Sequence, residues 1–150
     1  MAALTAQDVA DYFLVSVNEE IGDNLSNLKL QKLVYYAQGF NLALHDVPLF
    51  DESIQAWTHG PVVPALYHHY KAQGAGAISP PEDFDDSKYD EGTREILDEV
   101  FKVYGQYSAW KLADMTHIEP PWTETSPGQS ISRSAMRDYF RTMLVNGEDS

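Results

Sequence analysis

Apolar and polar residues follow the period of an amphipathic helix over much of this chain. The clearest case is segment 28–44, LKLQKLVYYAQGFNLAL, in which apolar residues recur at helical spacing. The residues that form this stripe are Leu30, Leu33, Val34, Ala37 and Leu44. The same periodicity places Lys29 and Lys32 on the opposite, solvent-facing side. The pattern therefore predicts one long helix whose apolar side faces a core.

Further helices are predicted from capping and stop residues. The expected caps are Thr5 with Asp8, Asn24 or Ser26, Asp90, Ser108, and Ser130 or Ser132. The expected stops are Gly22–Asn24, His45, Gly74, Gly105 and the region after Met115. Together they predict a mainly α, compact single-domain helical fold of about five to seven helices over residues 1–150. Residues 146–150 are expected to form a frayed C-terminus.

Prolines interrupt the helical pattern after the long helix. Each proline fixes φ and disfavours helical geometry in the residue before it, so the chain should run extended from Pro48 onward. Leu49–Phe50 and Ile54–Trp57 are predicted to form a short β-hairpin between the second and third helices. Strand content should be confined to residues 49–57. The third helix should start at Pro61 or Pro64 and run to about Gln73.

Two loops are expected in the second half of the chain. Residues 74–89 form an acidic stretch that contains glycine and proline, and residues 117–128 contain three prolines. Gly60-Pro61 and Pro120-Pro121 are interpreted as rigid corners, which serve either folding or the positioning of neighbouring side chains.

The tryptophans divide into predicted core residues and a predicted surface anchor. Trp57 and Trp110 are expected in the core, whereas Trp122 follows two prolines and is a candidate contact residue, together with Tyr67. Tryptophan and tyrosine occur both in cores and at the centres of protein interfaces, so composition alone does not assign them.

The formal net charge is −13, which opposes binding to nucleic acid by this chain alone. Its few cations could make only a small basic patch; they include Lys29, Lys32, Arg133, Arg137 and Arg141. Two interpretations of the acidity stay open: it keeps the protein soluble, or it attracts a basic protein partner.

The sequence contains no cysteine, which excludes disulfides, thiolate metal sites and cysteine nucleophiles. It also has no apolar run that could span a membrane and no secretory signal pattern at its start. A cytoplasmic location is therefore expected.

The five histidines give no metal-ligand spacing, because neither H-E-x-x-H nor any i, i+4 histidine pair occurs. A site could arise only if the fold brought His59, His117 and a carboxylate together. That arrangement would suit a small hydrolase, which is the enzymatic alternative. No catalytic residue, cofactor or bound metal is predicted.

Four segments in order resemble the Panacea domain family, which includes SocA-type antitoxins and GepA-type phage-associated proteins. They are LKLQKLVYYAQGFNLAL, PLFDESIQAWTHGPVVPALYHHYK, YGQYSAWKLADMTHIEPPW and ISRSAMRDYF, and they span nearly the whole chain.

The resemblance implies an antitoxin that binds and neutralises a protein toxin, usually encoded by the adjacent gene. A second mode of action that the resemblance implies is that of an adaptor, which delivers the toxin to a ClpXP-type protease. A phage or prophage protein that modulates a host protein by binding is the other alternative. The candidate partner-binding residues are Trp122, Tyr67, His59, His117, Glu82, Asp83, Asp85 and Asp86.

Overall fold

The computed structural model describes residue 2 and residues 4–17, 25–74 and 76–148, with side chains as far as Leu144. Its elements in order are α1 (Ala6–Ser16), α2 (Asn27–His45), β1 (Gln55–Trp57), β2 (Gly60–Val62), α3 (Pro64–Tyr70), the 3₁₀ turns η2 (Lys71–Gln73) and η3 (Asp86–Lys88), α4 (Glu91–Tyr104), α5 (Ala109–Thr116), α6 (Pro120–Thr123) and α7 (Arg133–Glu148). The predicted mainly α fold with a short hairpin between the second and third helices is confirmed. The predicted break at residues 22–24, the alternative cap Asn24 and residues 149–150 lie outside the described residues.

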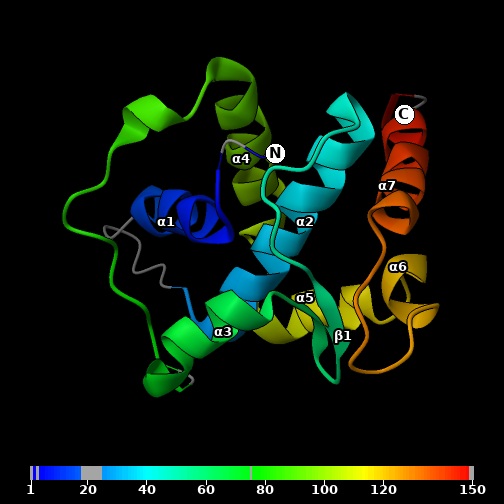
Figure 1. The fold of residues 1–150 in the computed structure, drawn as a ribbon, viewed down its shortest axis with the longest axis horizontal. Helices are drawn as coiled ribbons and strands as arrows, with labels where there is room; N and C mark the ends of the chain where they lie inside the picture. The colour runs from blue at the N-terminus through cyan, green and yellow to red at the C-terminus, as the bar shows by residue number, and fades with distance from the viewer. Residues whose placement is uncertain (1, 3, 18–24, 75, 149–150) are drawn as a thin grey trace.

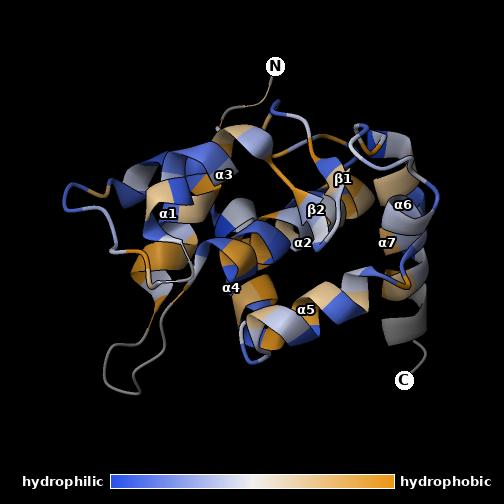
Figure 2. Cartoon of the chain, turned by 90° about the horizontal axis from the view of Figure 1, so that it is seen from below, coloured by the Kyte–Doolittle hydropathy of each residue, from blue (hydrophilic) through white to orange (hydrophobic). Residues whose placement is uncertain are grey.

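The long helix α2 passes through the middle of the molecule, and the other elements pack around it (Figure 1). Helices α1, α3, α4, α5 and α7 and strand β2 all contact it. Seen from below, α2 lies between the hairpin and α5 (Figure 2). The prediction of a solvent-facing side was wrong for Lys29 and Lys32, because α2 is enclosed nearly all round and both lysines are buried. Lys29 Nζ donates to the carbonyl of Gly105 at 2.7 Å.

Aromatic side chains fill the contact between α2, α4 and α7. Tyr36 stacks on Tyr104 with ring centroids 4.0 Å apart, and Phe140 packs edge-on against Tyr35 and Tyr36. A Cβ atom at Gly39 would lie 2.2 Å from the Phe140 ring, so glycine is required for α7 to approach α2 this closely.

The predicted helix caps are confirmed wherever the structure describes them. Thr5 and Asp8 form the reciprocal capping box of α1, and Ser26 caps α2. Asp90 caps α4, Ser108 caps α5, and the Ser132 hydroxyl accepts from Ala135 N at the start of α7. Short polar side chains at these positions satisfy the free N–H groups of a first turn.

The predicted hairpin occurs, but only one of its two strands was placed correctly: Ile54–Trp57 corresponds to β1, whereas Leu49–Phe50 is not a strand and β2 was not predicted. β1 pairs with β2 in antiparallel register, from Gln55 opposite Val62 to Trp57 opposite Gly60, so strand content extends beyond residue 57. The backbone of Leu49 and Phe50 is bonded instead by the Gln38 side chain, which accepts from Leu49 N and donates to Phe50 O. Since these groups already have a partner in α2, they are not available to a strand.

The structure also decides one predicted boundary and corrects one predicted loop. The third helix begins at Pro64, the later of the two predicted starts, because Pro61 belongs to β2. The segment 117–128 was predicted as a loop but contains the short helix α6, with two prolines in its first turn. Proline is tolerated there because an N–H in a first turn has no partner within the helix.

Candidate functional site

The turn of the β-hairpin is held by side chains from outside the hairpin. Trp122 Nε1 donates to the carbonyl of Trp57 at 2.8 Å, and His117 Nε2 lies 2.9 Å from the carbonyl of Thr58. On the α2 side, Lys32 Nζ donates to the carbonyl of Pro61 at 2.9 Å, and Gln31 Oε1 accepts from Val63 N. Four side chains thus fix a seven-residue segment from both sides.

Lys32 is the unusual member of this set, because its side chain is fully buried. Burial disfavours the charged amine and lowers the pKa of Lys32 to about 7. Gly60 sits directly above it with φ +110°, and a Cβ there would lie 2.8 Å from Lys32 Cε and 2.6 Å from Thr116 Oγ1. Both the backbone angle and the lack of space therefore require glycine at residue 60.

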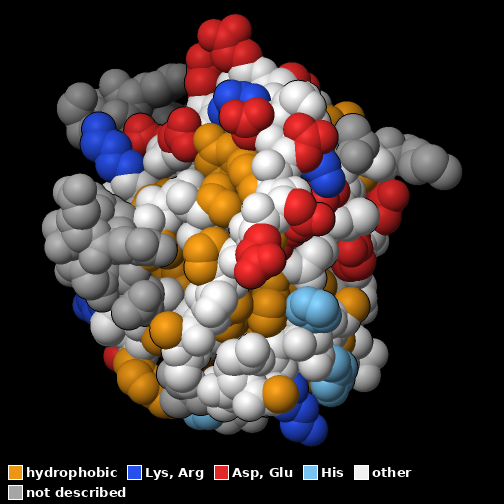
Figure 3. All heavy atoms as spheres, turned by 90° about the vertical axis from the view of Figure 1, so that its left-hand side faces the viewer, with side chains coloured by type: hydrophobic (Ala, Val, Ile, Leu, Met, Phe, Trp, Pro, Cys, Tyr) orange, Lys and Arg blue, Asp and Glu red, His pale blue; other side chains and the backbone are white. Residues whose placement is uncertain are grey.

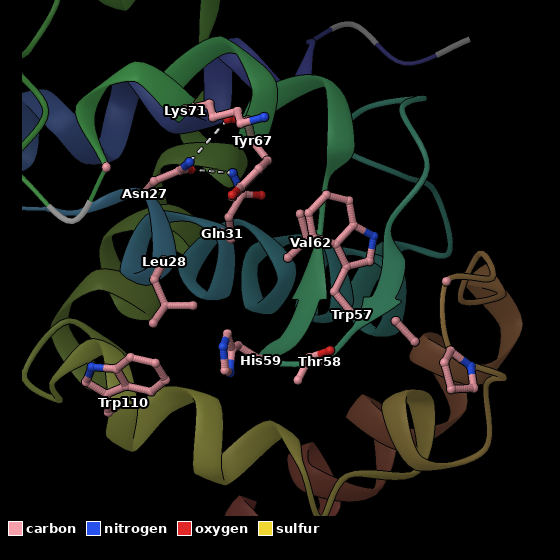
Figure 4. A pocket seen from close by; sticks show the side chains of 14 residues that line it. Asn27, Leu28, Gln31, Trp57, Thr58, His59, Val62, Tyr67, Lys71 and Trp110 are labelled. Carbon is pink, nitrogen blue, oxygen red and sulfur yellow. Dashed lines mark hydrogen bonds between the residues drawn. The ribbon is translucent and has the colours of Figure 1, made fainter.

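A groove of about 730 Å³ opens beside this turn (Figure 4). Its floor contains Asn27 and Gln31, which are bonded to each other, and Asn27 Nδ2 also donates to the carbonyl of Tyr67. Leu28 and Val62 add apolar surface, so the groove combines a satisfied polar floor with apolar walls.

Aromatic rings form the walls of the groove. Trp57 packs edge-on against Tyr67 with ring centroids 5.0 Å apart. On another side of the groove, His59 packs edge-on against Trp110, also with centroids 5.0 Å apart. The core prediction for Trp110 was wrong: 61% of its surface is exposed. It stands at the second position of α5, whose buried face is carried by Leu112, Ala113 and Thr116 instead. Trp57 is half-buried, and its Nε1 donates to Gln55 Oε1 at 2.9 Å.

The eight predicted partner-binding residues occupy three places. Tyr67 and His59 line the groove. His117 and Trp122 lie together beside the hairpin turn, with ring centroids 4.5 Å apart, and both contact its backbone. The acidic residues are on another part of the molecule, so these predictions do not converge on one site.

The acidic residues Glu82, Asp83, Asp85 and Asp86 are all exposed. Figure 3 shows the side of the molecule that lies to the left in Figure 1, and carboxylates gather on its upper part, where Figure 1 places the start of α4. Phe84 and Tyr89 fasten the segment by packing against Tyr12 of α1, and Tyr89 OH donates to the carbonyl of Asp8. Hydrogen bonds from Ser87 lower the pKa of Asp85. The carboxylates therefore face solvent, while two aromatic residues hold the backbone.

Glu119 is a buried carboxylate that binds two tyrosine hydroxyls, and it was not among the predicted site residues. Tyr35 OH donates to its Oε1 at 2.9 Å and Tyr36 OH donates to its Oε2 at 2.8 Å. Burial raises the pKa of Glu119 to about 7, although the tyrosine hydrogen bonds act in the opposite direction. The sequence signal was the pair Tyr35-Tyr36 in a helix, since two adjacent tyrosines inside a core need a polar partner for their hydroxyls.

Among the described residues, no group of three His, Cys, Asp or Glu side chains could hold a metal ion. His59 contacts Trp110, whereas His117 contacts Trp122 and the carbonyl of Thr58. The two histidines thus have different neighbours. Over the described part of the chain, no helix is both long and apolar enough to cross a membrane.

Comparison with known proteins places the chain in a family. Residues 30–123 match the family model described as antitoxin SocA-like, Panacea domain. The chain is also 30% identical, over 148 residues, to the antitoxin SocA of Caulobacter vibrioides strain NA1000 / CB15N, an alignment that covers 81% of this chain and 75% of that protein. The protein therefore belongs to the SocA-like Panacea domain family. No solved structure matches it significantly.

Proposed function

We propose that this protein is an antitoxin that binds a protein toxin and neutralises it, without a catalytic step of its own. Its membership of the SocA-like antitoxin family carries this proposal. The aromatic residues of the groove, Trp57, Tyr67 and Trp110, all fall inside the matched segment 30–123.

The groove is the proposed toxin-binding site. Exposed tryptophan and tyrosine contribute much of the energy of protein interfaces, because they bury a large area at a small cost in side-chain entropy. Trp110 is the most accessible of the three rings, and His59 supports it from the hairpin turn. The turn is already fixed by Lys32, His117 and Trp122, so binding need not order it. In this proposal Trp122 acts by positioning the turn, and Tyr67 contacts the toxin.

Charge supports a toxin with a basic or mixed-charge surface. The net charge is −13, and the exposed carboxylates of residues 82–86 lie away from the groove. Exposed charges of this kind act mainly on the rate of association and are screened by salt.

The test is co-expression with the open reading frame adjacent to the gene. Growth rescue together with co-purification of the two proteins is the expected result. Trp110→Ala should weaken both, whereas Val15→Ala, a change at an exposed apolar residue of α1 outside the groove, should weaken neither. A neighbour that is harmless, or toxic but unbound, would contradict the proposal.

Neutralisation by delivery to a ClpXP-type protease is a finer part of the proposal. It predicts that the toxin has a shorter half-life when the antitoxin is present, and that this effect is lost in cells without the protease. If the toxin level stays constant while growth is rescued, neutralisation occurs by blocking.

A further inference from the structure

A second hollow, separate from the aromatic groove, lies between α2, α4 and α7. Its volume is about 300 Å³, and its lining is apolar apart from two glutamates. The lining residues are Phe40, Leu44, Ile96, Val100, Val103, Tyr104 and Leu144, with Glu95 and Glu99 beside them. We name this surface the α2–α4 groove.

Two of its apolar side chains are open to solvent. Leu44 is 51% exposed and Val103 is 38% exposed, while Ile96 and Val100 between them form a buried floor. A single exposed aliphatic side chain is ordinary, but these two line one apolar hollow with polar residues at its edge, which is the arrangement that marks interaction sites. The hollow follows α4 from Ile96 to Val103, a distance of about 10 Å at 1.5 Å per residue. That length matches about two turns of a helix laid along it.

The charge at its edge selects the kind of partner. Glu95 and Glu99 are one helical turn apart on α4, so both carboxylates lie along the same edge of the hollow. Both are exposed, and none of the ion pairs found among the described residues involves either of them. A second copy of this chain would bring the same carboxylates against each other, and an anionic lipid surface would be repelled. A cationic segment would be attracted.

We propose that the α2–α4 groove binds an amphipathic helical segment of a partner protein, with apolar residues at i, i+3 or i+4 spacing and Lys or Arg beside them. The apolar residues of the segment contact Leu44, Val100 and Val103, and its cations pair with Glu95 and Glu99. The inference rests on the proposed function only for the identity of the partner, which would be the toxin.

The probe is a fluorescein-labelled synthetic peptide of about 15 residues, with leucine at helical i, i+3 and i+4 spacing and lysine or alanine elsewhere. A scrambled peptide of the same composition measures attraction by charge alone. Fluorescence anisotropy with the full-length protein should show binding of the patterned peptide at least about tenfold tighter than that of the scrambled one.

Four variants locate the site of binding. Val103→Glu and Leu44→Glu, each at an exposed position, should weaken the patterned peptide by about tenfold or more. Glu95→Gln with Glu99→Gln should weaken it about threefold or more at low salt. The matched control, Glu82→Gln with Asp83→Asn, removes the same formal charge from another surface and should change the affinity by less than about twofold. Circular dichroism of each variant confirms the fold.

The inference is overturned if the scrambled peptide binds equally well, if both groove variants bind like the parent, or if the two charge-neutralised pairs lose affinity equally. Self-association in sedimentation that Val103→Glu abolishes would make a second copy the occupant and would also overturn it. Peptide binding without toxin co-purification would reject the proposed function alone. Toxin co-purification without peptide binding would reject this groove alone.

Discussion

The hairpin turn and the acidic segment both connect helices, yet their backbones are fixed in different ways. In the turn, the backbone of residues 57–63 is hydrogen-bonded by four side chains, which come from α2, from α6 and from the end of α5. One of these side chains is a fully buried lysine. In the segment 82–90, two aromatic residues attach the chain to α1, and the carboxylates point into water. A backbone fixed in advance lowers the entropy lost on binding, whereas solvated charge affects mainly the rate of encounter.

The largest expected effect is a pH dependence that arises from Lys32. Its pKa is lowered from 10.5 to about 7 in the folded protein, so the unfolded chain binds more protons between those values. Stability should therefore rise as pH increases from about 7 to about 10, by up to about 4 kcal/mol from this group. Lys32→Met should remove this rise, as measured by urea denaturation at several pH values.

The matched control for the Lys32→Met variant is Lys88→Met, which removes an exposed lysine of the acidic segment. Lys88 is exposed and pairs with Asp8 at 3.0 Å, and this partner raises its pKa rather than lowering it. The Lys88 variant should retain the parent's rise in stability between pH 7 and 10. If Lys32→Met retains it as well, the lysine is not buried in the way described.

Glu119 should give the opposite slope at lower pH. Its pKa is raised from 4.5 to about 7, so its contribution is fully present below pH 4.5 and is lost as pH rises through about 7. Glu119→Gln should flatten the fall in stability between pH 4.5 and 7, which is on the order of 3 kcal/mol from this group. Chemical denaturation of parent and variant at pH 5 and pH 7.5 measures the difference, and equal slopes for both would contradict the assignment.

Gly60→Ala tests how strictly the turn is constrained. The new Cβ would meet Lys32 and Thr116 at a backbone φ of +110°, so the free energy of unfolding should fall by about 3 kcal/mol. Gly74→Ala is the control outside the turn: its φ is also positive, but nothing lies within 4 Å of the new atom. It should cost about 1 kcal/mol. Equal losses in the two variants would mean that contact with Lys32 and Thr116 has no effect.

Trp110→Ala separates binding from stability. Because 61% of the side chain is exposed, the free energy of unfolding should change by less than about 1 kcal/mol. Dissociation of the toxin should be faster by about tenfold or more. Thermal denaturation and surface plasmon resonance measure the two quantities. A large loss of stability would restore the core assignment.

The smallest effect is expected in the acidic segment. Replacing Glu82, Asp83, Asp85 and Asp86 by Gln or Asn should leave the thermal unfolding midpoint of the protein essentially unchanged, since all four are exposed. Association with the toxin should slow and its salt dependence should flatten. Unchanged association rates at low salt would leave the segment with no role in binding.

The sequence predicted most of the helices because local signals define their ends. Thr5, Ser26, Asp90 and Ser108 cap helices in the structure as their positions indicated. The errors came from long-range contacts. The period of α2 could not show that α5 and the hairpin would cover its lysines, and the chemistry of Leu49 and Phe50 gave no sign that Gln38 would bond their backbone.

The candidate site was predicted only in part, for a similar physical reason. His59 and Tyr67 were identified as contact residues and do line one groove, but Trp110 was assigned to the core because tryptophan is usually buried. Its exposure depends on which side of a short helix packs inward, and that is decided by elements distant in the sequence. The role of Lys32 was hidden for the same reason.

The close packing of Phe140 on Gly39 has a consequence for the protein during its synthesis. Arg141 Nε bonds the carbonyl of Ala43 across 98 residues of chain, in the same contact between α2 and α7. A ribosome that adds about 5–20 residues per second needs about 5–20 s to span that interval. During that time α7 does not yet exist to cover its part of the apolar surface of α2, so this contact forms among the last in the fold.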